Sequence, residues 1–416
     1  MTTKASFPLL PPPPALLIGG GMISREVILP TLFQLRRQGV LGDITCVTRR
    51  SKTVERLRAE LPGEKFRAYP DPAAGEPASD ADGWRRFLAE AEPGTAVIVA
   101  TPDHFHTEIA LAAIERGLDA IVQKPLCLKV ADAHAIMKAA GEKGIYVLTD
   151  YHKRHDPAVR GARYRFRRGD LGQMLHGHAW IEERREMPLQ NFALWASQSS
   201  PFEYVGVHYA DAYYFITGLK PRRVTGFGQK KFLAPRGQDA WDAVQAVIEW
   251  EDGSAFWIQT AWVLPQSSSA LTSQGLHLLG TEGEYWADHK DRNCRFVTTS
   301  GGYEDYNPNF FKPFDSWEPG VDVDWNGYGY RSIAQGIEDI RYLRAEIAGL
   351  DAREALERRK EILEAMGPKR ALPEQALIGT AINEAVRLSL EHGSRAVEFG
   401  DGMVPRLRAE ASTAAR

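Results

Sequence analysis

The chain has 416 residues, more than one ordinary hydrophobic core can hold, so we expect two domains. Apolar residues make up 44% and charged residues 25%, which is the balance of a globular protein rather than a disordered or fibrous one. The formal net charge of −3 gives no basic footprint for nucleic acid or for an anionic membrane, so both classes of partner are excluded.

Cysteine usage and the amino end predict a cytoplasmic protein. The three cysteines lie far apart in the sequence and are odd in number, which argues against a disulfide framework. No run of about 18 apolar residues is present, so no membrane-spanning helix is expected. Lys4 precedes a short apolar stretch, but Pro8 and Pro11–Pro14 interrupt it where an export signal needs a helix.

The first 150 residues alternate between strand and helix signals. Pro70–Asp82, rich in proline, glycine and aspartate, is expected to be a surface loop. Continuous apolar strands separated by helices predict a parallel sheet covered on both faces, as in a doubly wound α/β domain of the Rossmann type. The expected strands are Ala15–Gly21, Ile44–Thr48, Ala96–Thr101, Ala120–Gln123 and Ile145–Thr149. The expected helices are a stretch ending at Arg37, then Thr53–Leu61, Glu108–Arg116 and Val130–Glu142.

The pattern changes near residue 170, and the rest predicts an α+β domain with a large, mainly antiparallel open sheet. Asp252 and Gly253 suit a tight hairpin turn because Asp-Gly supplies positive φ angles. Residues 301–330 read as a long ordered loop, and two helices are expected near the end, with Gly393 as a C-cap. The expected strands are Met174–Glu183, Arg222–Phe232, Asp242–Trp250, Ser254–Leu264, Gly275–Gly280 and Cys294–Thr299, and the helices are Asp351–Met366 and Ala376–His392.

A glycine-rich turn directly follows the first expected strand and opens a helix. It matches the pattern G-x-G-x-x-G, with Ser24 in place of the third glycine. Gly19 permits the tight turn, and Gly21 lets the backbone approach a pyrophosphate. Met22 and Ile23 then open the helix, whose free N–H groups and positive dipole end favour an anion. We therefore predict a dinucleotide site here; a purely structural glycine turn is the alternative.

The end of the second strand bears on which dinucleotide is bound. An Asp or Glu there would hold the two ribose hydroxyls of NAD, but the sequence continues Thr48-Arg49-Arg50-Ser51. Arg49, Arg50 and Ser51 suit a 2′-phosphate, which they would hold through charge-assisted hydrogen bonds. The cofactor is accordingly NAD(P), with a lean to NADP; two solvated arginines on a loop are the alternative.

Three ordered motifs carry a resemblance to a known family. They are Ala100-Thr101-Pro102-Asp103-His104-Phe105-His106, Gln123-Lys124-Pro125 and Gly206-Val207-His208-Tyr209-Ala210-Asp211. The chain resembles the Gfo/Idh/MocA oxidoreductases, named for glucose–fructose oxidoreductase and inositol dehydrogenase, over nearly its whole length. The resemblance implies cofactor contacts from the loop with Thr101, Pro102 and His106, and from Gln123 and Lys124.

The resemblance gives Lys124 a part in a proton relay beside the nicotinamide. An ammonium there would favour the developing alkoxide, and partial burial tunes its pKa. Pro125 fixes its own φ and pushes Lys124 into an extended conformation. The family's motif is Glu-Lys-Pro, so Gln123 is a departure that removes a negative neighbour. A surface lysine before a loop is the alternative.

Tyr204, His208 and Asp211 lie at offsets of four and seven, which places them on one face if residues 203–216 form a helix. The resemblance implies that His208 is the acid/base for the substrate hydroxyl, with Asp211 as its orienting partner. Tyr204 stands where many members of the family have a catalytic aspartate, and it would instead donate a hydrogen bond to a substrate oxygen. A core histidine satisfied by Asp211 is the alternative.

A basic segment follows the strand Ile145–Thr149, and the resemblance places it at the substrate cleft. Tyr151, Lys153 and Arg154 are the expected contacts with sugar hydroxyls or an anionic group. A charged linker between domains is the alternative. Histidine pairs also occur, but none has a third ligand at convincing spacing, so no metal is expected.

These features together predict an NAD(P)-dependent oxidoreductase acting on a hydroxyl of a sugar, glycoside or cyclic polyol. Residues 1–128 would bind the dinucleotide, and residues 129–416 would bind the substrate and mediate oligomerisation. Two other functions remain open: redox-assisted glycoside elimination with a retained cofactor, and a nicotinamide-binding regulator without catalysis, which Gln123 and Tyr204 motivate. Apolar residues on both faces of the expected strands predict a homo-oligomer, either a dimer or a tetramer.

Overall fold

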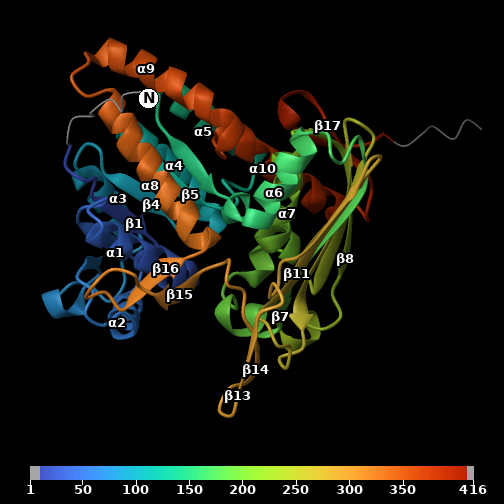
Figure 1. Ribbon diagram of the computed structural model, residues 1–416, viewed down its shortest axis with the longest axis horizontal. Helices are drawn as coiled ribbons and strands as arrows, with labels where there is room; N and C mark the ends of the chain where they lie inside the picture. Colours follow the sequence, from blue (N-terminus) through green and yellow to red (C-terminus); the bar gives the residue numbers. More distant parts are fainter. Residues whose placement is uncertain (1–9, 410–416) are drawn as a thin grey trace, which may run out of the picture. The chain divides into compact units, whose positions relative to one another are not determined.

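The computed structural model describes residues 10–409, and contacts among them define two compact units (Figure 1). The first unit contains the described residues up to Cys127, together with Asp132–His155 and Phe310–Ala376. The second contains Leu128–Ala131, Asp156–Asn309 and the described residues from Leu377 onward. The division of function between residues 1–128 and 129–416 stays a proposal.

The first unit is built on a six-stranded parallel sheet with strand order β3-β2-β1-β4-β5-β6. β1, β4 and β5 are buried along their whole length, as expected for strands covered on both faces. The predicted doubly wound domain is confirmed; β3, which has three residues, was missed. The strands are β1 (Ala15–Ile18), β2 (Ile44–Val47), β3 (Arg67–Tyr69), β4 (Ala96–Val99), β5 (Ala120–Gln123) and β6 (Val147–Asp150).

The helices of this part of the chain include two that the sequence did not predict, α3 and α8. α8 carries Gly336, where a Cβ atom would lie 2.5 Å from Ile121 Cδ1 on β5, so glycine allows the helix to pack closely on the sheet. A capping box of Asp351 and Glu354 begins α9. The helices are α1 (Leu29–Arg37), α2 (Ser51–Glu60), α3 (Gly83–Glu90), α4 (His106–Glu115), α5 (Val130–Lys143), α8 (Tyr328–Glu346) and α9 (Ala352–Met366).

The second unit contains an eight-stranded sheet in the order β12-β11-β7-β10-β9-β8-β17-β18. Neighbouring strands are antiparallel except β7 and β10, so the predicted, mainly antiparallel sheet is confirmed. The predicted hairpin at Asp252 and Gly253 joins β9 to β10, and Gly253 has φ +87°. The strands are β7 (Met174–Arg184), β8 (Pro221–Gln229), β9 (Ala243–Trp250), β10 (Ala255–Leu264), β11 (Thr272–Gly280), β12 (Glu284–Asp288), β17 (Val397–Phe399) and β18 (Pro405–Leu407).

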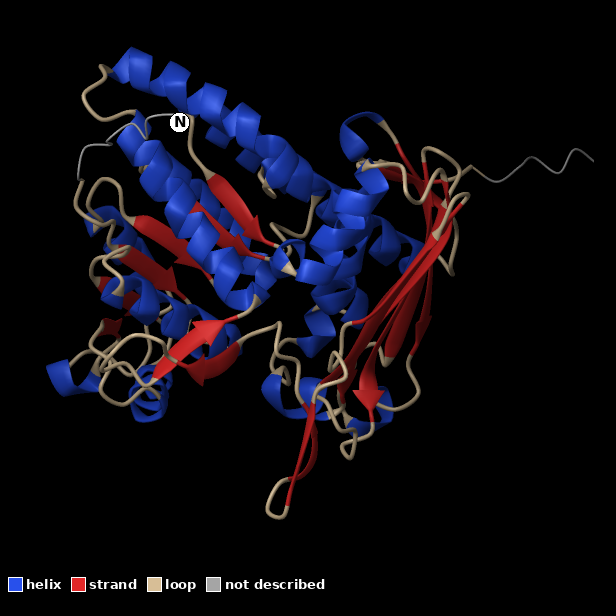
Figure 2. Cartoon of the chain, viewed as in Figure 1, coloured by secondary structure: helices blue, strands red, loops and turns tan. Residues whose placement is uncertain are grey.

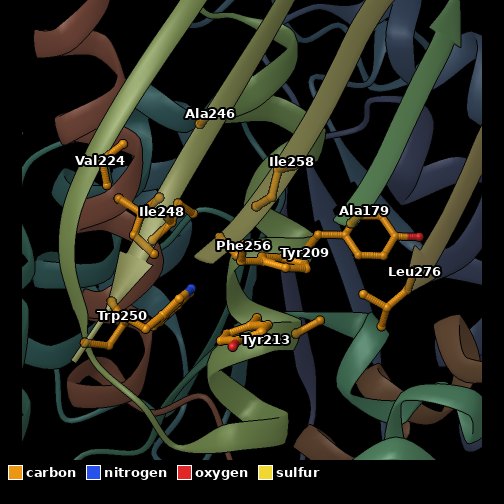
Figure 3. Close-up of a cluster of buried hydrophobic side chains, with 14 of the residues drawn as sticks. Ala179, Tyr209, Tyr213, Val224, Ala246, Ile248, Trp250, Phe256, Ile258 and Leu276 are labelled. Atoms are coloured by element: carbon orange, nitrogen blue, oxygen red, sulfur yellow. The ribbon is translucent and has the colours of Figure 1, made fainter. Parts of the chain in front are cut away.

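Helices cover one face of this sheet, as Figure 2 shows. They are α6 (Pro157–Arg167), α7 (Val207–Thr217) and the part of α10 (Pro373–Glu391) that belongs to this unit. In Figure 3 the rings of Tyr209 and Tyr213 from α7 lie against strand residues such as Phe256 and Trp250. The Tyr213 ring centroid is 4.5 Å from that of Phe256 and 4.6 Å from that of Trp250. This aromatic layer fixes α7 against the sheet.

Two short hairpins occupy much of the region predicted as a long loop. β13 (Arg295–Thr298) pairs with β14 (Gly302–Asp305), and β15 (Lys312–Asp315) pairs with β16 (Val323–Asn326). β13 therefore belongs to a separate two-stranded sheet and not to the large sheet, which corrects the assignment of Cys294–Thr299. In a strand of four residues the alternation of apolar and polar side chains is too short to distinguish the strand from an ordered loop.

Within residues 10–409, no helix combines the length and the apolar composition needed to cross a bilayer. Lys4 and Pro8, which contributed to the expectation about export, lie outside the described residues.

Candidate functional site

The glycine turn between β1 and the first helix requires its glycines for two different reasons. Gly19 has φ +113°, and a Cβ there would lie 2.2 Å from the carbonyl oxygen of Ala100, so only glycine fits. At Gly21 a Cβ would meet no atom within 4 Å, which leaves open space above the turn. Ser24 is buried, and its hydroxyl donates a 2.9 Å hydrogen bond to the Gly19 carbonyl. Ser24 thus ties the turn to the start of the helix.

The turn lies at the topological switch point of the parallel sheet. β1 has β2 on one side and β4 on the other, and in open parallel sheets ligands bind at the carboxyl ends of the strands where the order reverses in this way. Met22 and Ile23 are half-buried at the start of the helix. Thr101 and Pro102 follow β4, and the buried Thr101 Oγ1 has no hydrogen-bond partner among the described residues. A buried hydroxyl without a partner at this edge of the sheet is a candidate contact for a polar atom of a ligand.

Arg49 and Arg50 follow β2, and both are exposed. The loop that carries them is held by its backbone, since the amide of Asp80 donates to the Arg49 carbonyl at 2.9 Å. Ser51 is buried at the first position of α2. Within residues 10–409, neither guanidinium forms an ion pair with a carboxylate. Both arginines are therefore available to an anionic group.

His106 connects two loops at this edge of the sheet. Its ring is buried, with Nδ1 2.8 Å from the Pro125 carbonyl and Nε2 3.0 Å from the Thr101 carbonyl. Burial lowers the pKa of His106, and the nearby charge of Lys124 lowers it further, against the effect of the two carbonyls. Both ring nitrogens thus face main-chain oxygens, so the imidazole positions the loops after β4 and β5.

Gln123 ends β5 and Lys124 follows it, and the neighbouring strand contributes a residue that the sequence did not identify as functional. Gln123 Nε2 donates a 2.7 Å hydrogen bond to Asp150 Oδ2 at the end of β6, and both side chains are buried. Burial raises the pKa of Asp150, while Gln123, Ser332 and Lys124 oppose that rise. Lys124 itself is half-buried. A carboxyl and an amide therefore meet at one end of the sheet, and the charge of Lys124 acts on that carboxyl.

The basic segment after β6 is more buried than a linker would be. Tyr151, Lys153 and Arg154 are 2%, 2% and 6% exposed, which argues against the charged-linker alternative. His152 lies between Tyr151 and Lys153 in the sequence. The centroid of its ring is 5.4 Å from the ring centroid of Phe310 and 5.4 Å from that of Tyr328. Burial holds the pKa of His152 well below its ordinary value, and the charges of Lys153 and Lys124 contribute.

In the second unit, Tyr204, His208 and Asp211 lie on one continuous helical segment. A π-helical turn, Phe202–Gly206, leads into α7, so the predicted helix is confirmed although its first turn is wider than an α-helix. His208 is 4% exposed and Asp211 1% exposed. Tyr204 is half-buried and packs against three aromatic rings, those of Phe192, Trp195 and Trp262, at 4.6, 5.3 and 6.1 Å.

Glu203 anchors this π-helical turn, a role that the sequence did not reveal. Its side chain is buried, and Arg387 Nε on α10 donates to its carboxylate at 2.8 Å. The amide of Asn383 donates to the Glu203 carbonyl at 3.3 Å. These partners lie about 180 residues further along the chain, so no local pattern could have identified them.

No group of three or more His, Cys, Asp or Glu side chains suited to a metal ion occurs among residues 10–409. Lys124 belongs to the first unit and His208 to the second, so their convergence on one substrate is a proposal.

Two family models match the chain. The oxidoreductase family model with an NAD-binding Rossmann fold matches residues 15–151, and the GFO/IDH/MocA C-terminal domain model matches residues 159–286. Together these spans cover more than half of the 416 residues. The match confirms the resemblance that the sequence motifs indicated.

Two curated relatives are about a quarter identical to this chain over the stretches that align. A 2,7-anhydro-N-acetylneuraminate hydratase of Mediterraneibacter gnavus is 26% identical over 233 residues, which are 51% of this chain and 61% of the relative. The scyllo-inositol 2-dehydrogenase (NAD(+)) of Bacillus subtilis is 23% identical over 266 residues, 61% of this chain and 75% of the relative. The chain thus spans less than two thirds of the first relative's length.

Solved structures share the fold over almost the whole chain. The myo-inositol 2-dehydrogenase from Lactobacillus plantarum has a TM-score of 0.65 at 15% identity and covers 94% of this chain and 100% of its own. The scyllo-inositol dehydrogenase from Lactobacillus casei, solved with NAD(H) and scyllo-inositol, has a TM-score of 0.64 at 14% identity, with 93% and 99% coverage. With its two matched domains and this fold, the chain belongs to the Gfo/Idh/MocA family of oxidoreductases and carries that family's NAD-binding Rossmann domain.

Proposed function

We propose that the protein is an NAD(P)-dependent oxidoreductase that transfers a hydride between nicotinamide and a secondary alcohol or keto carbon of a sugar, glycoside or cyclic polyol. The observation that carries the proposal is the pairing of an open glycine turn at the switch point of the sheet with Lys124 at the end of β5. Relatives named as inositol and levoglucosan dehydrogenases support this substrate class.

The residues of the first unit have defined roles in this proposal. Gly19 and Gly21 leave room for the pyrophosphate, and Thr101 Oγ1 gains a polar partner. When bound, the nicotinamide accepts or donates the hydride. The Lys124 ammonium lies beside the reacting hydroxyl and favours its alkoxide form.

The residues of the second unit handle the proton and the substrate. His208 accepts the hydroxyl proton as general base, and Asp211 orients its imidazole. Tyr204 donates a hydrogen bond to a substrate oxygen, and its aromatic neighbours form an apolar wall for a sugar ring. Tyr151, Lys153 and Arg154, which belong to the first unit, contact further substrate oxygens.

The direct test combines two measurements. Mass spectrometry of nucleotide released from the purified protein should detect NAD or NADP. A screen at 340 nm of sugars, glycosides and inositols, with each dinucleotide, should then find a substrate that reduces it. Tight dinucleotide binding without hydride transfer across a broad panel would favour the regulator instead.

We propose that the dinucleotide is NADP. Replacing both Arg49 and Arg50 by alanine should raise the Kd for NADP by about tenfold or more and change that for NAD by less than about threefold, because charge-assisted hydrogen bonds contribute roughly 1.5–3 kcal/mol. Titration calorimetry with both dinucleotides measures this. Arg58→Ala is the matched control, since Arg58 lies on α2 and pairs with Asp71. Equal losses for the two dinucleotides would contradict the assignment.

The hydratase among the relatives supports a second candidate: oxidation of a sugar hydroxyl, elimination at the acidified neighbouring carbon, and return of the hydride to the product. In that case product accumulates with catalytic amounts of dinucleotide and without net change at 340 nm. A stoichiometric rise in reduced dinucleotide would instead identify a net dehydrogenase.

We also propose that the protein forms a homo-oligomer through the sheet face that the helices leave uncovered. On this face Phe227, Val247, Trp257 and Trp286 are 45%, 41%, 45% and 63% exposed, a concentration of apolar surface that favours association. Trp257→Glu should convert a dimer or tetramer into a monomer in light scattering. Trp317→Glu, at a residue that is 97% exposed outside this sheet, should leave the mass unchanged. A monomeric wild-type protein would refute the proposal.

A further inference from the structure

Gln123 stands where the family's Glu-Lys-Pro motif has glutamate. Its side chain hydrogen bonds to a carboxyl group on the next strand. Gln123 and Asp150 are partners in the parallel register of β5 and β6. Gln123 Nε2 donates to Asp150 Oδ2 at 2.7 Å, and the two side chains are 7% and 3% exposed. The carboxyl group missing at position 123 is thus present one strand away, at the end of this hydrogen bond.

Asp150 has capacity for another donor. Its second oxygen, Oδ1, is buried and accepts no hydrogen bond from residues 10–409. Leaving a buried carboxylate oxygen without a donor is costly, so a cationic or hydroxyl donor is expected in the working site. The charge of Lys124 already acts on Asp150, because it lowers the pKa that burial raises.

We propose that Asp150 is the charge partner of Lys124 and that Gln123 orients it, so that the pair does the work of the Glu-Lys-Pro glutamate. Asp150 is then a positioning residue, which acts on the reaction through Lys124. The effect of Asp150 on catalysis rests on the proposed function. Its effect on the protonation of Lys124 does not, and it can be measured without a substrate.

The charge of Lys124 also acts on two buried histidines. His106 from α4 and His152 from the turn after β6 are both affected by the Lys124 charge, and burial keeps each neutral by lowering its pKa. Lys153, in the same turn as His152, is cationic and acts on that histidine. Asp103, in the turn before α4, acts on His106. Burial raises the pKa of the Asp150 carboxyl, and the charge of Lys124 opposes that rise.

The coupling has a defined sign. A carboxylate beside Lys124 favours the ammonium, so Asp150→Asn should let Lys124 lose its proton at lower pH. We expect the midpoint of deprotonation to fall by about one pH unit, which raises the neutral fraction of the amine about tenfold at any pH below the midpoint. The measurement is competitive acetylation of Lys124 by limiting acetic anhydride between pH 6 and 11, in the full protein without substrate, quantified by peptide mass spectrometry.

A charge swap provides the stricter test. Gln123→Glu combined with Asp150→Asn moves the carboxylate across the same hydrogen bond and preserves its shape, so the Lys124 midpoint should return to within about 0.3 pH unit of wild type. Asp119→Asn is the matched control: Asp119 is buried just before the amino end of β5 and pairs with Arg359, and its loss should leave the Lys124 midpoint unchanged.

An unchanged midpoint in folded Asp150→Asn protein, or a swap that fails to restore it, would overturn the proposal. If the single variant does not fold, Gln123→Glu alone decides, because a second carboxyl group in this pair should raise the Lys124 midpoint above that of wild type. With a substrate in hand, the alkaline limb of the kcat/KM profile should move with the labelling midpoint while KM changes little, because activity needs the Lys124 ammonium. If no substrate is found, the proposed function fails, yet the labelling result stands independently.

Discussion

Replacing Lys124 by alanine is expected to lower kcat by about a thousandfold or more and to change the dinucleotide Kd by less than about threefold. The side chain supplies both the proton relay and the positive charge that favours the alkoxide, and each such contribution is worth roughly 10²–10⁴ in rate. The dinucleotide contacts we propose come from the glycine turn and from the loop after β4, which this change leaves intact. Steady-state rates at 340 nm and calorimetric dinucleotide titration measure the two quantities.

The matched control is Lys138→Ala. Lys138 is also on the first unit, but its side chain is 77% exposed on α5, and among residues 10–409 its ion pair is with Glu142, one helical turn away. It should turn over substrate at the wild-type rate. Normal turnover of Lys124→Ala protein would remove Lys124 from the chemistry, and with it the central assignment of the proposed mechanism.

The Rossmann part of the fold could be read from sequence because its strands are buried on both faces and therefore form continuous apolar runs. α8 could not. Gly329 and Gly336 disfavour a helix locally, and the advantage of Gly336 exists only once Ile121 and Leu148 of the sheet lie against it. Tertiary packing thus overrides a local preference that the sequence displays.

The candidate site shows the same limit. Gly19 and Lys124 follow strand signals directly, so their position at the edge of the sheet follows from chain order. Asp150 becomes meaningful only when the parallel register places it opposite Gln123, and register is not visible in one sequence. Glu203 depends on Arg387 from a distant helix. Sequence motifs therefore identify residues such as Gly19 and Lys124, but they do not identify residues that act through a partner distant in the sequence.

Gly19→Ala and Gly21→Ala should separate the structural role of the glycine turn from its binding role. At Gly19 the new Cβ would lie 2.2 Å from the Ala100 carbonyl oxygen, at φ +113°. Strained backbone of this kind costs about 1–3 kcal/mol before the clash is counted, so the melting temperature should fall together with dinucleotide affinity. Thermal unfolding and calorimetry report the two effects.

Gly21→Ala isolates the binding role because its Cβ would meet nothing within 4 Å in the unliganded chain and no positive φ is required there. The protein should melt as wild type does, while a methyl group in the space assigned to the pyrophosphate should raise the dinucleotide Kd by about tenfold or more. Gly19 is thus needed by the fold, and Gly21 only by a ligand. If Gly21→Ala protein binds both NAD and NADP normally, the pyrophosphate does not lie over this turn.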